Sequence, residues 1–146
     1  MKINQLSVFL ENKPGQLSKP CRALAEAGIN ILTLSLADTQ QFGIMRLIIH
    51  QWAKAKAVLE KAGCVVKVTE VVAIEVSDRP GGLAEVLEGI EAAAINIEYM
   101  YAFTFRSGDK AIIIFRFDDP DGAIRALQSK GINVVDNVGL YDRAAV

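Results

Sequence analysis

The chain has 146 residues, of which 51% are hydrophobic and 23% charged, and its formal net charge is −1. This composition is typical of a globular protein, and a charge so close to neutral gives no argument for a nucleic-acid or anionic-membrane partner. No apolar stretch approaches the ~20 residues that a membrane-spanning helix needs.

The N-terminal segment and the cysteines indicate a cytoplasmic protein. Polar residues interrupt the first five positions at once, so this segment lacks the pattern of a secretory signal. Cys21 and Cys64 are the two cysteines, and they lack the spacing of a metal or redox motif. We expect both to be reduced thiols, with a single disulfide between them as the alternative.

The second half of the sequence repeats the landmarks of the first. At an offset of 66 residues, segment 12–17 (NKPGQL) corresponds to 78–83 (DRPGGL), 29–31 (INI) to 95–97 (INI), and 47–49 (LII) to 113–115 (IIF). Gly63 corresponds to Gly131 at an offset of 68, so we place two extra residues of the second copy around 118–119. Such self-similarity indicates two copies of one structural unit, here residues 1–70 and 71–146.

Each copy begins with a predicted strand and a predicted helix. Alternating apolar residues in 5–10 and 72–76 predict a strand with one buried face. A Pro-Gly pair then interrupts each strand. Apolar residues three and four apart in 17–25 and 83–90 predict an amphipathic helix, and Gly28 ends this helix in the first copy.

A hairpin, a second helix and a last strand follow in each copy. Branched and aromatic residues predict strands over 29–37 and 95–105, and turns connect them to strands over 45–50 and 111–117. The second helices cover 52–62 and 120–130, and Asp119-Pro120 supplies an N-cap and a first residue for the latter. The last strands cover 64–68 and 132–135.

The element order is therefore βαββαβ in both copies. Two helices on one face of an antiparallel sheet form the ferredoxin-like arrangement, which belongs to the α+β class. Segment 65–76 contains no flexible linker. We therefore expect two ferredoxin-like units packed side by side, each with an antiparallel sheet and its helices on one face.

This pattern resembles the ACT domain family, over essentially the whole chain as a tandem pair. The resemblance is carried by a strand ending in Asn/Asp-x-Pro-Gly-x-Leu, a helix, and Ile-Asn-Ile opening the next strand, all occurring twice. It implies a non-catalytic regulatory protein of amino acid metabolism, an allosteric effector sensor that binds a free amino acid at the interface between two units. It also implies a partner enzyme or regulator that receives the signal, and an intrachain pseudo-dimer, alone or within a homodimer.

The resemblance further implies a ligand site formed by the first loop, the start of the first helix and the Asn that opens the second strand. A glycine at a helix start lets backbone N–H groups approach a carboxylate, and Asn12 or Asp78 can accept a hydrogen bond from an ammonium group. The alternative for these residues is a purely structural role in turns. The candidate residues are Asn12, Pro14, Gly15, Gln16, Leu17, Asn30, Asp78, Pro80, Gly81, Gly82, Leu83 and Asn96.

No motif indicates an enzyme. The single histidine, His50, has no obvious partner in sequence, and no Cys/His cluster, P-loop, GxSxG or GxGxxG is present. We therefore expect no catalytic residue, no metal and no cofactor. Arg79 lies on the loop where acylphosphatases of similar fold hold phosphate, but the glycine-rich pattern of that family is missing. The alternative function is a protein-binding regulator with degenerate ligand sites.

Overall fold

The computed structural model of the chain describes residues 1–38 and 40–144. By its contacts the chain divides into two compact units. The N-terminal unit comprises Asn4–Thr69, and the C-terminal unit comprises Met1–Ile3 together with Glu70–Val146. The first three residues therefore group with the second half of the chain.

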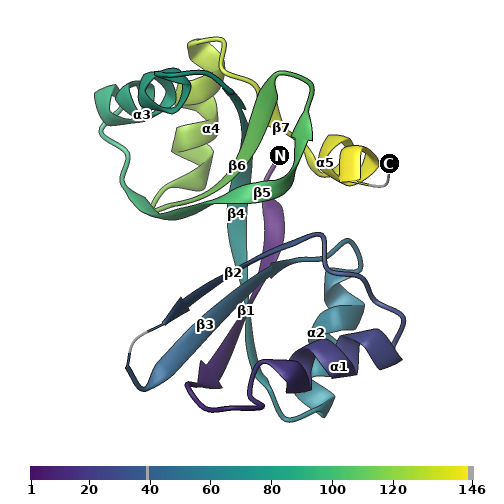
Figure 1. The fold of residues 1–146 in the computed structure, drawn as a ribbon. Helices are drawn as coiled ribbons and strands as arrows, with labels where there is room; N and C mark the ends of the chain where they lie inside the picture. Colours follow the sequence, from purple (N-terminus) through teal and green to yellow (C-terminus); the bar gives the residue numbers. More distant parts are fainter. Residues whose placement is uncertain (39, 145–146) are drawn as a thin grey trace. The chain divides into compact units, whose positions relative to one another are not determined.

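The N-terminal unit is a four-stranded antiparallel sheet with two helices. Its sheet order is β2-β3-β1-β4, with β1 and β2 each paired antiparallel to β3 (Figure 1). The element bounds are β1 (Ile3–Glu11), α1 (Ser18–Glu26), β2 (Thr33–Asp38), β3 (Phe42–Ile48), α2 (Trp52–Lys61) and β4 (Val65–Ser77), of which β1 and β4 extend into the C-terminal unit.

The C-terminal unit repeats this arrangement and adds one helix. Its sheet order is β7-β4-β6-β5, and all three pairings are antiparallel. The remaining bounds are α3 (Gly82–Ala92), β5 (Ile97–Ser107), β6 (Lys110–Phe117), α4 (Pro120–Ser129), β7 (Val134–Val135) and α5 (Asn137–Ala144). The expected α+β fold with antiparallel sheets is confirmed, whereas β2 begins later and β7 is shorter than the sequence predicts.

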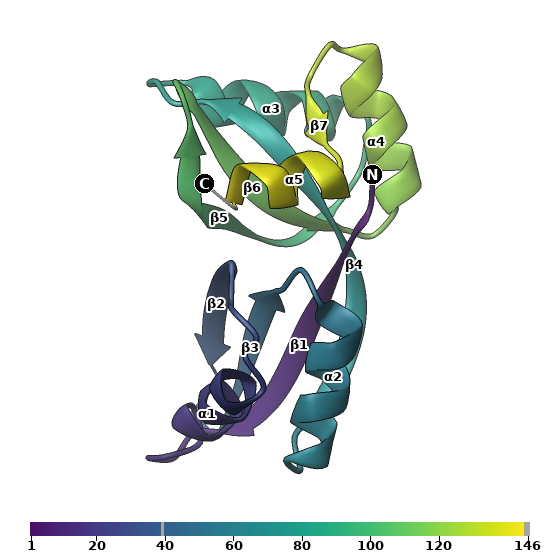
Figure 2. The ribbon, with the colours of Figure 1, turned by 90° about the vertical axis from the view of Figure 1, so that its right-hand side faces the viewer.

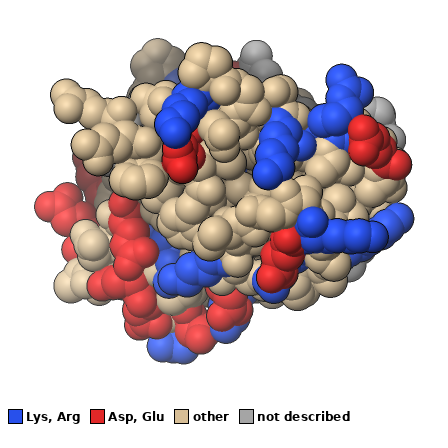
Figure 3. All heavy atoms as spheres, turned by 90° about the horizontal axis from the view of Figure 1, so that it is seen from below, with Lys and Arg blue, Asp and Glu red and all other residues tan. Residues whose placement is uncertain are grey.

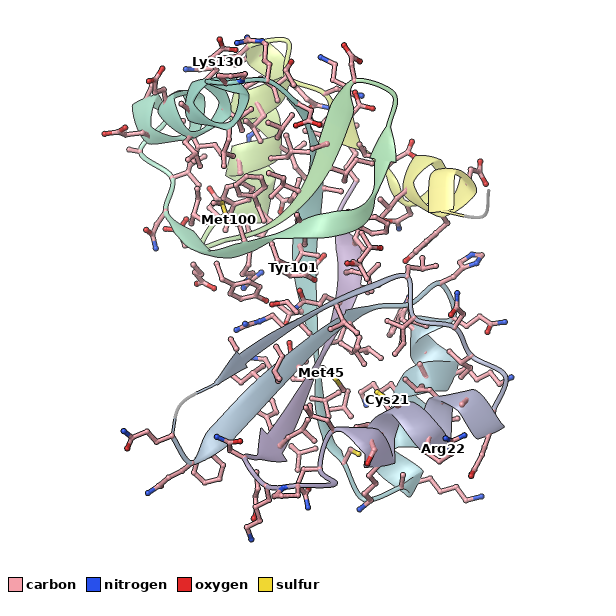
Figure 4. All side chains as sticks on the ribbon, in the orientation of Figure 1. Cys21, Arg22, Met45, Met100, Tyr101 and Lys130 are labelled. Atoms are coloured by element: carbon pink, nitrogen blue, oxygen red, sulfur yellow. The ribbon has the colours of Figure 1, made fainter. Side chains whose placement is uncertain are left out.

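Each unit has its own hydrophobic core between sheet and helices. In the N-terminal unit Leu6 and Val8 of β1 lie in one buried cluster with Met45, Leu24 and Leu59. Figure 4 shows Met45 pointing from the sheet toward the helices, with Cys21 on the inner side of α1 and Arg22 on its outer side. The predicted alternation of the first strand therefore places its apolar residues in the core.

The corresponding core of the C-terminal unit is built from the matching positions of β4. Val72 and Ile74 lie in one buried cluster with Val86, Phe115 and Leu127. The rings of Phe115 and Phe117 stack with their centroids 5.5 Å apart. Because residues two apart on a strand share a face, the two phenylalanines present one aromatic surface to α3 and α4.

The opposite face of both first strands is buried as well, which corrects the expectation of one buried face. Gln5 and Ser7 of β1 are buried, and the Gln5 side-chain amide donates to Ser7 Oγ at 3.2 Å. Val71 and Ala73 of β4 are fully buried. In the C-terminal unit α5 lies against the sheet face that is turned away from α3 (Figure 2), so this sheet carries helices on both faces.

Helix α5 was not expected from the sequence. Asp136 Oδ1 accepts a hydrogen bond from the backbone N–H of Gly139 at 2.6 Å, which satisfies one N–H of the first turn. Leu140 is fully buried and fixes the helix against the unit. Since α5 is a short helix with Gly139 in its first turn, it carries little intrinsic helix propensity.

The two extra residues of the second copy lie in β5, and not near 118–119 as the sequence comparison suggests. Leu6 pairs with Leu47 in the N-terminal unit, and Val72 pairs with Phe115 in the C-terminal unit. The offset is therefore 66 between β1 and β4 but already 68 between β3 and β6. The register of β5 against β6 shifts between Ala102 and Arg106, so a β-bulge absorbs the insertion.

The N-terminus is fastened to the C-terminal unit. Lys2 Nζ lies 3.2 Å from Glu70 Oε2 and 3.3 Å from Asp121 Oδ1, and these two carboxylates raise the pKa of Lys2. Ile3 is fully buried. These contacts explain why residues 1–3 group with this unit.

Candidate functional site

The loop after β1 is held by the turn between β2 and β3. The backbone N–H of Asn12 donates to the carbonyl of Gln41 at 3.0 Å, and its side-chain amide donates to the carbonyl of Gln40 at 3.4 Å. Gly15 has a φ of +86°, a conformation that glycine adopts without steric cost. Ser18 Oγ donates to the Gly15 carbonyl at 3.1 Å. The loop therefore has a defined path into α1.

The equivalent loop after β4 reverses direction more tightly. Gly81, with a φ of +87°, is the N-cap residue of α3. The backbone N–H of Arg79 donates to the carbonyl of Ser77 at 2.9 Å. The guanidinium of Arg79 lies 2.7 and 2.8 Å from the two carboxylate oxygens of Glu85, and this carboxylate raises the pKa of Arg79. The Arg79–Glu85 pair thus links the loop to the first turn of α3.

Helices α1 and α3 begin without a capping side chain. Neither N-cap residue, Leu17 of α1 or Gly81 of α3, makes a side-chain capping hydrogen bond, whereas Asp119 Oδ1 accepts from Gly122 N at 3.0 Å at the start of α4. The first-turn N–H groups of a helix have no partner within the helix and lie at its positive end.

Only part of each first turn is offered to an anionic group. Lys19 N already donates to the Gly15 carbonyl at 3.3 Å, and Gly82 N donates to the Arg79 carbonyl at 3.0 Å. Pro20 has no N–H.

Four of the twelve predicted ligand residues line a hollow, and these four are divided among three separate hollows. Asn12 and Leu17 line a small pocket of about 60 Å³ beside Leu36. Gly82 lines a pocket of about 220 Å³ in the C-terminal unit. Asn96 lines a wide groove of about 450 Å³ next to Leu87. The other predicted residues line none of these three, namely Pro14, Gly15, Gln16, Asn30, Asp78, Pro80, Gly81 and Leu83.

Within the C-terminal unit the loop residues and Asn96 lie at opposite ends of α3. The helix has eleven residues, and so it is about 16 Å long. Gly82 is its first residue, whereas Asn96 follows its last turn and is held by Asp118, whose Oδ1 accepts from Asn96 N at 3.1 Å. These two predicted elements therefore do not share a pocket within one unit.

The pocket of about 220 Å³ is lined by charged residues that the sequence analysis missed. Lys110 Nζ donates to Ser77 Oγ at 3.0 Å and is partly buried. Glu75 and Glu85 are the acidic residues among those that line the same pocket. The missed residues are Glu75, Ser77, Glu85, Val86, Lys110, Gly131, Ile132 and Asn133.

Charged side chains of both signs occur together elsewhere on the molecule too. Figure 3 shows basic and acidic side chains interspersed on the face seen from below.

Within the described ranges no group of three or more His, Cys, Asp and Glu side chains is arranged to hold a metal ion. Cys21 and Cys64 are free thiols. None of the helices in the described part of the chain is long and apolar enough to cross a membrane.

Comparisons with known proteins extend over nearly the whole chain. A family model described as an ACT domain pair matches residues 1–143. Protein BT0572 from Bacteroides thetaiotaomicron, known from a crystal structure, is 36% identical, with 97% of this chain and 96% of that chain covered and a TM-score of 0.89. No match was found among curated proteins.

Two further solved structures share the fold at low identity. The regulatory subunit of aspartate kinase from Thermus thermophilus, in a ligand-free form, is 19% identical, with 86% of this chain and 91% of that chain covered and a TM-score of 0.61. The corresponding subunit from Thermus flavus is 17% identical, with 86% and 90% covered and a TM-score of 0.60.

Proposed function

Because the chain belongs to the ACT domain family, as a pair of ACT domains, we propose that it is a non-catalytic regulatory protein that binds a free amino acid. The fold that it shares with the Thermus aspartate kinase subunits is one that serves as a regulatory subunit there. In this proposal a partner enzyme or regulator in the cytoplasm responds to the loaded protein, and the ACT pair itself performs no chemistry.

The observation that carries the proposal is the repeated geometry of the two Pro-Gly loops. Each loop contains a glycine at positive φ, Gly15 or Gly81, and leads into a helix without a capping side chain. Such a helix start suits the carboxylate of an amino acid. Asn12 or Asp78 in the same loop can accept from the ammonium group.

Titration with the twenty amino acids tests this function. A ligand at 100 times its dissociation constant stabilises the folded state by about 2.7 kcal/mol, which a thermal melt detects easily. We expect one amino acid, or a small group of related ones, to raise the melting temperature. Asn12→Ala and Asp78→Ala should reduce this shift, whereas Glu26→Ala, at the exposed end of α1, should not. Melts that no amino acid moves would reject the proposal.

The alternative is a protein-binding regulator, and exposed apolar side chains of the N-terminal unit favour it. Phe9 is 43% exposed and Phe42 is 59% exposed on β1 and β3, and their partners in the register, Ile44 and Glu11, place them side by side on one sheet face. Exposed aromatic residues are frequent in protein interfaces. This alternative predicts no stabilisation by amino acids and co-purification with one defined partner that Phe42→Ser abolishes.

A further inference from the structure

Strands β2 and β5 each leave one edge uncovered in the described part of the chain. There β2 pairs with β3 alone, and β5 pairs with β6 alone. Proteins usually protect such an edge with charged residues, proline or a bulge. Segment 33–37 of β2 (TLSLA) has neither a charge nor a proline, and its register against β3 is continuous. We call β2 with α1 the N-terminal edge, and β5 with α3 the C-terminal edge.

Two leucines project from the N-terminal edge. Leu34 pairs with Leu47 and Leu36 pairs with Met45 across β3. Since paired residues of neighbouring strands share a face, both leucines belong to the face on which Leu47 and Met45 form the core. Leu34 and Leu36 are nevertheless 47% exposed each. Two neighbouring apolar side chains that are half exposed on an uncharged edge indicate a surface that another protein covers.

The C-terminal edge has an apolar groove on the corresponding face. The groove of about 450 Å³ lies between α3 and the start of β5, and its apolar lining consists of Leu87, Ile90, Ala94, Ile95 and Ile97. Met100 pairs with the core residue Phe115 and is 42% exposed. Figure 4 shows Met100 on the side of β5 that faces α3, opposite to Tyr101. This edge therefore presents a hollow where the N-terminal edge presents projecting side chains.

The two helices also differ in size at matching positions. At the offset of 66 residues, Leu87 and Glu91 of α3 correspond to Cys21 and Ala25 of α1. Leu87 and Glu91 line the groove beside β5, so α1 has small side chains where α3 has large ones. Well-packed contacts set large residues against small ones. Two unlike edges satisfy this condition, whereas two like edges do not.

Charge favours the same combination of unlike edges. Arg22 is exposed on the outer side of α1, and its counterpart in α3 is the exposed Glu88. Residues 1–70 contain nine Lys or Arg and five Asp or Glu, whereas residues 71–146 contain seven and twelve. Contact between two like edges would bring equal charges together, and contact between unlike edges brings opposite charges together.

We propose that the N-terminal edge of one chain binds the C-terminal edge of a second copy of this chain. The two leucines of β2 lie in the apolar groove beside α3, and Arg22 faces Glu88 and Glu91. A second copy is the partner because every chain carries both complementary surfaces. Such a contact is heterologous: two copies that exchange both contacts form a closed dimer, and longer series form rings or filaments. The inference goes beyond the proposed function and does not depend on it.

Light scattering on the full chain, over a range of concentrations, tests the assembly. We expect the wild type to have the mass of at least two chains. Leu34→Glu places a negative charge opposite the acidic edge and Met100→Lys a positive charge opposite the basic edge, so each variant should be a monomer. Phe42→Glu and Val65→Lys are the matched controls, because they add the same charges at residues that are 59% and 66% exposed elsewhere. Both controls should keep the wild-type mass.

Mixing the two monomeric variants shows which surfaces meet. Leu34→Glu retains an intact C-terminal edge, and Met100→Lys retains an intact N-terminal edge. An equimolar mixture should therefore associate through the intact edges, although neither variant associates alone. Arg22→Glu should weaken association by about twofold to tenfold, and Arg22→Glu combined with Glu88→Arg should restore it.

Several results would overturn the inference. One is a wild type that stays monomeric at the highest soluble concentration, and another is an assembly that Leu34→Glu or Met100→Lys leaves intact. Dissociation by only one of these two variants indicates a contact between like edges, and dissociation by Phe42→Glu indicates a contact through another face. If either edge variant loses its folded circular dichroism spectrum, the loss and rescue in the exposed Arg22 and Glu88 variants decide.

Discussion

The Cα of Gly82 packs against the carbonyl oxygen of Ser77, so closely that a β-carbon on residue 82 would overlap that oxygen. The first residue of α3 thus touches the last residue of β4, and these two elements, which line the pocket of about 220 Å³, meet without a side chain between them. A backbone oxygen cannot rotate away as a flexible side chain can.

Substitution of Gly82 should therefore destabilise the fold. Because α3 would have to move from β4, we expect Gly82→Ala to lower the free energy of unfolding by about 2 kcal/mol or more. Gly89→Ala in the same helix is the matched control: its new methyl group would make ordinary contacts of 3.5 Å with Lys130 and 3.6 Å with Ile132. Since alanine is favoured in a helix interior by about 0.5–1 kcal/mol, Gly89→Ala should stabilise. Urea denaturation of both variants checks the opposite signs.

The residues that follow α1 and α3 allow glycine and alanine to be exchanged in both directions. Gly28, after α1, has a φ of +69°, and Ala94, at the equivalent position after α3, has a φ of +55°. A left-handed conformation costs an L-residue about 1–2 kcal/mol. Ala94→Gly should thus raise the melting temperature and Gly28→Ala should lower it. Equal shifts of the same sign in both variants would contradict this explanation.

Asp119 is exposed, but we expect its side chain to contribute to the free energy of unfolding. Its carboxylate accepts from Gly122 N at the start of α4, and loss of such a cap costs about 1 kcal/mol. We expect Asp119→Ala to destabilise by this amount in chemical denaturation. The N-cap of α2, Gln51, makes no side-chain hydrogen bond, so Gln51→Asp should stabilise the protein. A neutral result for Asp119→Ala would mean that water replaces the cap at no cost.

Tyr141 of α5 should make the protein sensitive to alkali. Burial raises the pKa of this phenol above its ordinary value of 10.0. In the unfolded chain the phenol ionises near 10.0, while in the folded protein it stays neutral to higher pH, so its contribution is complete below pH 10.0 and is lost as pH rises through the folded pKa. The unfolding free energy of Tyr141→Phe should fall less steeply over this window. Denaturant titrations of the wild type and of Tyr141→Phe at neutral and at alkaline pH check this prediction.

Much of the fold could be predicted because the strongest periodic signals occur twice. The alternation of β1 and of the second part of β4, and the helical spacing of α1 and α3, agree with the core that the structure contains. The bulge between Ala102 and Arg106 could not be predicted, because a continuous run of branched and aromatic residues carries no mark of register. Helix α5 depends on the tertiary burial of Leu140, which outweighs its weak propensity.

The candidate site was harder to predict for a related reason. Glu75 and Lys110 stand at polar positions of alternating strands, where the sequence indicates a solvent-facing side chain, and they approach Asn133 only through the chain path after α4. One signal was available: at the positions of Glu75 and Lys110 the first copy has Phe9 and Phe42. This difference between the copies can be seen only when the strand register is known, because the sequence alignment of the two copies is two residues out of register at Lys110.

The attachment of residues 1–3 has a consequence for biosynthesis. Lys2 contacts Glu70 and Asp121, which the ribosome adds long after it has made Lys2. Domains generally fold in the order in which they are synthesised, so Asn4–Thr69 can fold while the first three residues still lack their partners. The contact of Lys2 with Asp121 can therefore form only after α4 has been synthesised. A stalled or shortened translation product would leave the buried Ile3 without its native surroundings.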